Sequence, residues 1–373
     1  MKNILFIGPY RQLDGWGLAT RDYIRSLATI PSLNITTRPV YLAPGYNDAH
    51  FNDDQIIRYE NQIYDHYDYV IQKTLPEYFH YDARFGKNIG LFTLEINDFS
   101  QTKTIENMKR MDEIWVPSSI EKDSLVSSGL QKPIRVISEA LDTDNIKPYP
   151  ASSLNPTIAH TFKFYTICEN NFRKNLEDLI IAFNLAFNIT DPVSLIIKTN
   201  GDIRELTEFS NQIKQSLQLS KPFRSEVWMT QRVSYEDILR LHSSCDCFVM
   251  PSYGEAFCRP AAEALCLGKN PIINKNSGMK DYIDNKNGFL VNSHKTPVIL
   301  KNHPISGNTD YYNARQYWYK IDIYDLIKQL QAAYTMYKKD NTAWKTKSEM
   351  GMSQKDQFSY SNIGKKLCIQ ASA

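Results

Sequence analysis

Short apolar runs alternate with stretches of helical apolar spacing along the first half of the chain. The helical spacing covers residues 21–27 and residues 119–129, and Gly129 ends the second stretch. Strands that alternate with helices are typical of a parallel sheet with crossover helices, which predicts a doubly wound α/β domain. The strands are expected at Asn3 to Ile7, Thr36 to Tyr41, Tyr69 to Gln72, Asn88 to Thr93, Glu113 to Val116 and Ile134 to Ser138.

The second half repeats this alternation after a stretch rich in Pro and Ser at residues 147–156. That stretch predicts a linker, so we expect one Rossmann-like domain in residues 1–150 and a second in residues 151–354. Residues 292–316 are polar and lack a pattern, which indicates an insertion near the surface. The second domain is expected to have strands at residues 162–168, 194–199 and 245–250 and helices at residues 175–187, 235–243 and 324–337.

Composition indicates a soluble globular protein of 373 residues, of which 42% are hydrophobic and 23% charged. A formal net charge of +2 gives no electrostatic basis for binding nucleic acid. No apolar run approaches the roughly 18 residues of a membrane span, so we expect a cytoplasmic protein with at most peripheral membrane association. The six cysteines lack paired C-x-x-C spacing, which favours buried free thiols over a metal site.

Residues 251–273 carry the most informative chemistry, because two glutamates flank a predicted turn from a strand into a helix. Glu255 lies on the loop, and Glu263 lies near the start of a helix that Pro260 opens and Gly268 ends. The free N–H groups at a helix start favour an anion, whereas carboxylates suit the hydroxyls of a sugar that carries phosphate. From spacing alone a second interpretation stays open, in which Glu263 complements its helix dipole and Glu255 is solvated.

The stretch P-S-Y-G-E-A-F-C-R-P-A-A-E-A-L-C-L-G resembles the signature of the retaining glycosyltransferases of family 4. Residues 276–291 are similar to a second element of that family, whereas Cys258 departs from the signature, which has glycine there. The resemblance implies an α/β protein of the GT-B fold. In that fold two Rossmann-like domains face each other across a cleft, and the last helix, here within residues 355–373, crosses back to the first domain.

The resemblance also implies which residues of this signature bind a nucleotide-sugar donor. Glu255 would orient the transferred sugar, and Glu263 would accept hydrogen bonds from the ribose. Ala256, Phe257 and Cys258, which lie between them, would also bind the donor. Cys258 in place of glycine is expected to tighten the loop beside the donor.

Basic residues at the end of another predicted strand would meet the phosphates. Arg173 and Lys174 belong to an element similar to the family's R-K-N, where basic side chains neutralise the donor diphosphate; by themselves they also fit a solvated pair at a helix start. The segment 231–246 resembles the element whose backbone, here at Arg232 and Val233, contacts the base. The remaining histidines, His242 included, are expected at the surface or in packing.

The first domain has two further candidates. Gly15 and Gly17 lie in a loop that runs into a helix, where a glycine lets the backbone approach a phosphate closely. The family has a glycine-rich loop at this place, so both are expected to donate backbone N–H groups to the donor. Glu95 follows a strand end and is a candidate for handling the acceptor, or else a structural carboxylate; the histidine that some family members have nearby is absent.

The resemblance therefore implies a retaining transferase that moves a hexosyl group from a UDP- or GDP-sugar to a hydroxyl of a glycan, lipid-linked or protein-linked acceptor. It implies neither a metal nor a cofactor. Two other interpretations stay open. One is a nucleotide-sugar epimerase of the same fold, and the other is a non-catalytic protein that binds a nucleotide sugar. The donor, the acceptor, the linkage and the oligomeric state are not determined by these residues.

Overall fold

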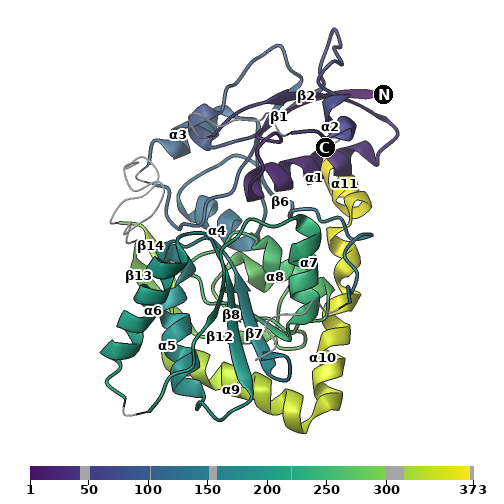
Figure 1. The fold of residues 1–373 in the computed structure, drawn as a ribbon. Helices are drawn as coiled ribbons and strands as arrows, with labels where there is room; N and C mark the ends of the chain where they lie inside the picture. The colour runs from purple at the N-terminus through teal and green to yellow at the C-terminus, as the bar shows by residue number, and fades with distance from the viewer. Residues whose placement is uncertain (43–50, 101, 151–157, 220, 299–314, 370–373) are drawn as a thin grey trace. The chain divides into compact units, whose positions relative to one another are not determined.

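The computed structural model describes residues 1–42, 51–100, 102–150, 158–219, 221–298 and 315–369 (Figure 1). Contacts within the chain divide these residues into two compact units. The N-terminal unit is formed by Met1–Asn145 together with the end of the chain from Asp356. The C-terminal unit begins at Ile146 and includes Tyr317–Lys355. The division falls five residues before the predicted boundary, and most of the predicted linker lies outside the described residues.

The N-terminal unit is built on a parallel six-stranded sheet in the order β2-β1-β3-β4-β5-β6. The predicted parallel sheet is thereby confirmed, although the second strand begins three residues earlier than expected, at Leu33. Every residue of β3 and of β5 is buried, as in strands that are covered on both faces. The strands are β1 (Lys2–Gly8), β2 (Leu33–Pro39), β3 (Tyr69–Lys73), β4 (Lys87–Leu91), β5 (Glu113–Val116) and β6 (Ile134–Val136).

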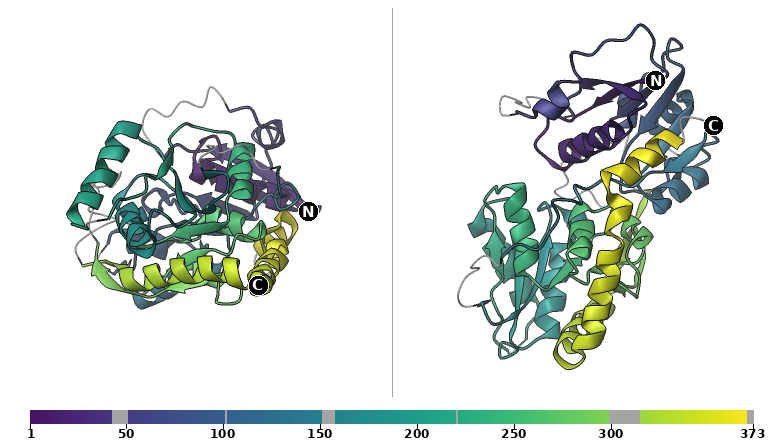
Figure 2. Two further views of the ribbon diagram at one scale, coloured as in Figure 1. Left: turned by 60° about the horizontal axis from the view of Figure 1, so that its bottom comes forward. Right: turned by 90° about the vertical axis from the view of Figure 1, so that its right-hand side faces the viewer.

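The last helix of the chain belongs to the N-terminal unit, as expected for this fold. Helix α11 (Tyr360–Ile369) packs against α1 (Gly15–Ala28), and its Ile363 and Leu367 enter the core of that unit (Figure 2). A Cβ atom at Gly364 would lie 2.3 Å from the carbonyl oxygen of Ser26, so only glycine permits this approach. The unit's other helices are α2 (Asp54–Ile57), α3 (Thr104–Arg110) and α4 (Ser119–Ser127).

The C-terminal unit has a second parallel six-stranded sheet, in the order β12-β11-β10-β7-β8-β9. Phe164, Leu195 and Val249 place buried side chains from three neighbouring strands into its core. The two predicted Rossmann-like sheets are therefore both present. The strands are β7 (Phe162–Ile167), β8 (Val193–Lys198), β9 (Val227–Met229), β10 (Cys247–Met250), β11 (Ile272–Asn274) and β12 (Phe289–Val291).

Six helices of the C-terminal unit surround this sheet in the described part of the chain. Asp340 both ends α9 and caps α10, accepting a hydrogen bond from the backbone N–H of Ala343, so the two helices follow each other through a sharp turn (Figure 2). The sequence did not predict α6 or α10. The helices are α5 (Leu176–Ala186), α6 (Ile203–Ser216), α7 (Tyr235–Ser244), α8 (Arg259–Cys266), α9 (Ile323–Lys339) and α10 (Asn341–Ser353).

The expectation of a patternless insertion at residues 292–316 is wrong at its start, where a strand forms and pairs with a strand just beyond residue 316. Strands β13 (Ser293–Pro297) and β14 (Tyr317–Ile321) form an antiparallel pair, and the ring of Trp318 stacks on Tyr253 at 5.9 Å. A non-local partner stabilises both strands, which the local sequence pattern does not reveal. Residues 299–314 lie outside the described residues. None of the helices in the described ranges is both long enough and apolar enough to cross a membrane.

Candidate functional site

Glu255, Lys174 and Arg173 meet at one edge of the C-terminal sheet. Strands β7 and β10 are parallel neighbours, so the segments that follow them leave the sheet on the same side. A single 3-10 turn, Phe172–Lys174, lies beyond β7, and the loop with Glu255 lies beyond β10. The Oε1 atom of Glu255 is 2.7 Å from Nζ of Lys174 and 3.1 Å from Nη1 of Arg173. Predicted phosphate-binding and sugar-binding residues are therefore in direct contact.

The carboxylate of Glu255 is buried and ionised by its neighbours. Its residue is only 6% exposed, and burial by itself would raise the pKa of the carboxyl group. The charges of Lys174 and Arg173 outweigh burial and lower that pKa below its usual value of 4.5. The interpretation of Glu255 as a solvated loop residue is therefore wrong, and so is the interpretation of the two cations as a solvated pair.

Backbone hydrogen bonds hold the loop around Glu255 in place. Arg173 donates from Nη1 to the carbonyl oxygen of Gly254 at 2.6 Å, and its own carbonyl accepts from the N–H of Tyr253 at 2.8 Å. The N–H of Gly278 donates to the carbonyl of Glu255 at 2.7 Å. Gly278 belongs to the second sequence element that resembles the family, so the two elements contact each other directly. The carboxylate of Glu255 is thus presented by a fixed backbone.

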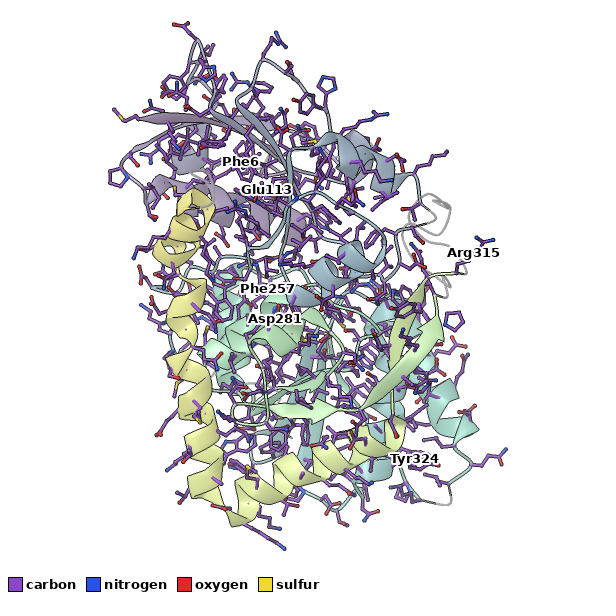
Figure 3. The ribbon with its side chains drawn as sticks, turned by 180° about the vertical axis from the view of Figure 1, so that it is seen from behind. Phe6, Glu113, Phe257, Asp281, Arg315 and Tyr324 are labelled. Atoms are coloured by element: carbon purple, nitrogen blue, oxygen red, sulfur yellow. The ribbon has the colours of Figure 1, made fainter. Side chains whose placement is uncertain are left out.

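Cys258 has a backbone conformation that explains why the family signature has glycine at this position. It is the residue before α8, with φ +66° and ψ 78°, in the left-handed region. Residues with a Cβ atom adopt this region at a cost of roughly 1–2 kcal/mol. Its neighbour Phe257, labelled in Figure 3, and Ala256 are each 2% exposed. These two side chains belong to the core, so they can line a ligand only through their backbone.

Asn175 takes the left-handed conformation at the other end of the site. Its φ is +58°, and its side-chain amide donates to the carbonyl of Pro251 at 3.1 Å and to Asp178 at 3.0 Å. Asparagine tolerates this region better than most residues because its short side chain can hydrogen-bond locally. The R-K-N element therefore connects the strand end of β7 to the loop that follows β10.

Glu263 lies one turn into α8 and is more deeply buried than Glu255. It is 1% exposed, and its Oε1 atom accepts a hydrogen bond from the hydroxyl of Tyr235 at 2.9 Å. Its Oε2 atom lies 3.4 Å from Nε2 of His242, and Arg259 approaches Oε1 at 3.9 Å. Glu263 therefore does more than complement its helix dipole, because it connects α8 to the start and the end of α7.

His242 is a residue whose role the sequence did not show. It was expected at the surface or in packing, and it is fully buried, with polar contacts on both ring nitrogens. Its position on the stripe of Ile238, Leu239 and Leu241 along α7 could have indicated burial, but not its partners.

Arg232 is exposed and Val233 half-buried, and both lie between β9 and α7 on the same side of the sheet as Glu255.

The three predicted site residues of the N-terminal unit, Gly15, Gly17 and Glu95, differ in their contacts. The N–H of Gly17 donates to the side chain of Asp14 at 2.9 Å, and a Cβ atom at Gly17 would lie 1.8 Å from the carbonyl oxygen of Gln12. The loop thus uses Gly17 for close packing and already engages its N–H group. A Cβ atom at Gly15 would meet nothing within 4 Å. Glu95 is half-buried in the segment that follows β4.

Glu121, which the sequence did not single out, lies behind Glu95. It is 3% exposed, and its Oε1 atom accepts the backbone N–H of Leu94 at 2.8 Å. Burial, together with the charges of Glu95 and Glu139, raises the pKa of its carboxyl group well above the usual value. Glu121 is one residue in a short polar helix, so its sequence context gave no signal of burial.

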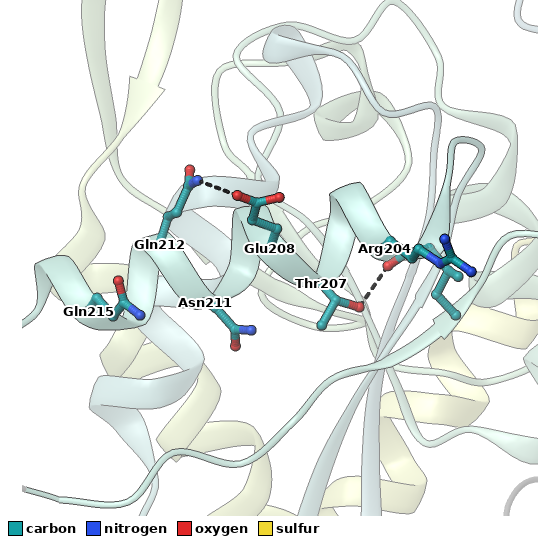
Figure 4. A pocket seen from close by; sticks show the side chains of 7 residues that line it. Arg204, Thr207, Glu208, Asn211, Gln212 and Gln215 are labelled. Atoms are coloured by element: carbon teal, nitrogen blue, oxygen red, sulfur yellow. Dashed lines mark hydrogen bonds between the residues drawn. The ribbon is translucent and has the colours of Figure 1, made fainter.

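A hollow in the C-terminal unit involves none of these residues. It has a volume of about 590 Å³ and is lined by residues of α6 alone, among them Arg204 and Thr207 (Figure 4). Gln212 donates to Glu208 across one turn of this helix at 3.3 Å. No predicted site residue lines it. Within the described ranges, no group of three or more His, Cys, Asp or Glu side chains is arranged to hold a metal ion.

Part of the chain matches a known protein family. Residues 162–302 match the family model described as glycosyl transferases group 1. The matched range includes Lys174, Glu255 and Glu263. No curated protein sequence matches the chain significantly.

Solved structures resemble the chain over its full length. Anabaena HepE in complex with UDP-glucose has a TM-score of 0.68 at 15% identity, and 100% of each chain is covered. Sucrose-phosphate synthase from Thermosynechococcus elongatus has a TM-score of 0.65 at 14% identity, over 99% of this chain and 98% of that one. The lipopolysaccharide outer core galactosyltransferase WaaB has a TM-score of 0.63 at 13% identity, over 100% and 99%. Residues 162–302 are therefore similar to the group 1 glycosyl transferases, and the chain has the GT-B fold of the solved structures that it resembles.

Proposed function

We propose that this chain is a retaining glycosyltransferase that moves a hexosyl group from a UDP- or GDP-sugar to a hydroxyl of a carbohydrate-bearing acceptor. The observation that carries the proposal is the contact of two cations with one buried carboxylate, Lys174 and Arg173 with Glu255, at the carboxyl edge of the C-terminal sheet. Ligands of open α/β sheets bind beyond the carboxyl ends of the strands. The diphosphate of a nucleotide sugar binds positive charge, and the hydroxyls of its sugar donate hydrogen bonds to a carboxylate, so both kinds of group are needed at one place.

The two cations are proposed to bind the diphosphate, and Glu255 to orient the sugar. Without donor, Glu255 compensates both positive charges. Lys174 is the more exposed of the two, with 13% of its side chain accessible against 8% for Arg173, so it is the one to turn toward a phosphate oxygen. The oxygen of Glu255 that Lys174 leaves can then accept a hydrogen bond from a sugar hydroxyl. Charge-assisted hydrogen bonds of this kind give both strength and orientation.

The chemical step then needs no metal in this proposal. The bond between the anomeric carbon and the diphosphate oxygen breaks, and a bond from the same face to the acceptor oxygen forms. The proton of the acceptor hydroxyl passes to the leaving phosphate oxygen. Negative charge grows on that diphosphate, and Lys174, Arg173 and the N–H groups at the start of α8 stabilise it where it develops.

Two residues of the N-terminal unit are proposed to bind ligand groups. Gly15 is the better backbone donor to a phosphate, because Asp14 already accepts the N–H of Gly17. Glu95 is proposed to bind the acceptor, and Glu121 holds the segment before it through the N–H of Leu94. Backbone contacts at Arg232 and Val233 are proposed to bind the base of the donor.

A nucleotide-sugar panel tests the proposal. Release of free UDP or GDP is measured with each donor, with and without a sugar acceptor, and the product's anomeric configuration is read by proton NMR. UDP-glucose comes first, because HepE was solved with it. We expect transfer with retention and undiminished turnover in EDTA. An epimerase would change the free donor without an acceptor, and a purely binding protein would release no nucleotide; either result overturns the proposal.

A further inference from the structure

A buried polar chain runs from the centre of the C-terminal sheet to Glu263. The hydroxyl of Tyr165, on β7, lies 2.7 Å from Nδ1 of His242, on α7. The opposite ring nitrogen, Nε2, lies 3.4 Å from Oε2 of Glu263, on α8. Tyr165 and His242 are 0% exposed and Glu263 is 1% exposed. Three elements therefore place a tyrosine, a histidine and a carboxylate in line, away from solvent.

The chain has a direction, because a carboxylate can only accept: the ring hydrogen faces Glu263 from Nε2, and Nδ1 is left to accept from the tyrosine. Burial raises the pKa of Tyr165 well above its usual value, so the phenol keeps its hydrogen and can donate it to Nδ1. A neutral imidazole that accepts on Nδ1 carries its hydrogen on Nε2, which then faces Glu263. Among the described residues this buried Nε2 has no hydrogen-bond partner. A shift of the carboxylate by a few tenths of an ångström would complete the bond, since N–H···O distances centre near about 2.9–3.0 Å.

The other carboxylate oxygen of Glu263 has a different kind of partner. Its Oε1 atom accepts the hydroxyl of Tyr235, which is only half-buried and lies two residues after Val233. A hydroxyl on the more accessible side of the carboxylate is the group that a ribose hydroxyl could replace one for one. Oε2 of Glu263 therefore faces a fixed partner, His242, whereas Oε1 faces an exchangeable partner, the hydroxyl of Tyr235.

We propose that His242, supported by Tyr165, is the positioning residue of the ribose subsite: it holds Oε2 of Glu263 so that Oε1 exchanges the Tyr235 hydroxyl for a ribose hydroxyl of the donor. This inference rests on the proposed function, because it needs a nucleotide donor at this site. His242 itself does not touch the ligand. It acts by fixing the rotamer of the residue that does.

The test compares a nucleotide with its 2′-deoxy form. Calorimetric dissociation constants are measured for UDP and 2′-deoxy-UDP, and for GDP and 2′-deoxy-GDP, with wild type, His242→Phe and His242→Gln. Wild type should prefer the ribonucleotide by about tenfold or more, as expected for a hydrogen bond to a charged group. His242→Phe should reduce that preference to within about threefold, and His242→Gln, which retains an N–H donor, should keep most of it.

If the role of His242 were purely structural, His242→Phe would weaken binding of the ribonucleotide and the deoxynucleotide equally and leave the ratio of their dissociation constants unchanged. Such a result, or an undiminished preference in His242→Phe, overturns the inference. If His242→Phe fails to fold, as judged by circular dichroism, Tyr165→Phe decides the matter. It removes only the hydroxyl that fixes the imidazole tautomer, so the preference for ribose should fall in it as well. If wild type binds neither UDP nor GDP, the proposed function fails; if it binds them but does not prefer ribose, only the ribose subsite fails.

Discussion

Nζ of Lys174 lies 2.7 Å from Oε1 of Glu255, and both side chains are largely withdrawn from water. A surface pair of this type contributes little, whereas a buried one is costly to break, because the remaining charge has no water to compensate it. The pair joins two residues 81 positions apart in the sequence, which come from the ends of neighbouring parallel strands. It is the contact on which both the stability of this loop and its proposed chemistry depend.

Glu255→Gln should destabilise the C-terminal unit most strongly at neutral pH. The variant removes the buried carboxylate charge that Lys174 and Arg173 both contact, which costs about 3 kcal/mol or more. The folded pKa of Glu255 is lowered, so its stabilising effect is fully present above pH 4.5 and is lost as the pH falls below that value. Urea unfolding at several pH values should therefore show the gap to wild type closing in acid. The exposed Glu208→Gln is the control, and an equal gap at every pH would contradict this account.

Cys258→Gly should be more stable than Cys258→Ala, in reverse of the usual order of these residues. Both variants lose the buried sulfur, but only alanine retains a Cβ atom at a φ of +66°. The difference is expected to be about 1 kcal/mol, the smaller end of the cost of the left-handed region. Thermal unfolding of the two variants measures it directly. Equal stability, or a more stable alanine variant, would mean that the loop relaxes out of this conformation.

Gly17→Ala should damage the N-terminal unit, whereas Gly15→Ala should fold normally. The new methyl group at Gly17 would lie 1.8 Å from the carbonyl of Gln12, and that at Gly15 would have open space. We expect a loss of about 2 kcal/mol or more for the first and less than about 0.5 kcal/mol for the second. Hydrogen exchange of α1 reports on the N-terminal unit alone. Similar protection in both variants would show that Gly17 has no packing role.

Tyr360→Phe should loosen α11 from α1. The Tyr360 hydroxyl donates to the buried carboxylate of Asp22 at 2.6 Å, and a hydrogen bond to a charged group contributes about 1.5–3 kcal/mol. Tyr324→Phe is a matched control, because Tyr324 is 73% exposed on α9 (Figure 3). Urea unfolding should separate the two variants by at least about 1 kcal/mol. If Tyr324→Phe were as unstable as Tyr360→Phe, the result would contradict a stabilising role of the Tyr360 hydroxyl.

Sequence patterns predicted the elements whose signals are local. The runs at Glu113 to Val116 and Tyr69 to Gln72 are apolar and β-branched because both faces of those strands are covered, and their positions agree with the structure. Gly268, with a φ of +71°, ends α8 as the sequence indicated. What depends on distant partners was missed. Strand β13 is stabilised by its pairing with β14, whose Trp318 stacks on Tyr253, and no periodicity within residues 292–316 reveals these partners.

The same contrast between local signals and distant partners applies to the site residues. Residue types and spacing indicated Glu255 and Lys174, but their contact depends on strand order, which the sequence does not contain. His242 was expected at the surface or in packing, and only the fold brings Tyr165 and Glu263 to its two nitrogens. Cys258 looked like a departure that tightens the loop, whereas its backbone angle shows a strained position that glycine would relieve.

The most direct measurement is calorimetric binding of UDP and GDP to wild type and to Lys174→Met. Lys286→Met, which removes an exposed lysine of the same unit, controls for the loss of one positive charge. The account predicts that at least one nucleotide binds saturably, and that Lys174→Met weakens it by about tenfold or more while Lys286→Met leaves it unchanged. Binding of neither nucleotide, or equal affinity in all three proteins, would contradict the assignment of this site to a nucleotide-sugar donor.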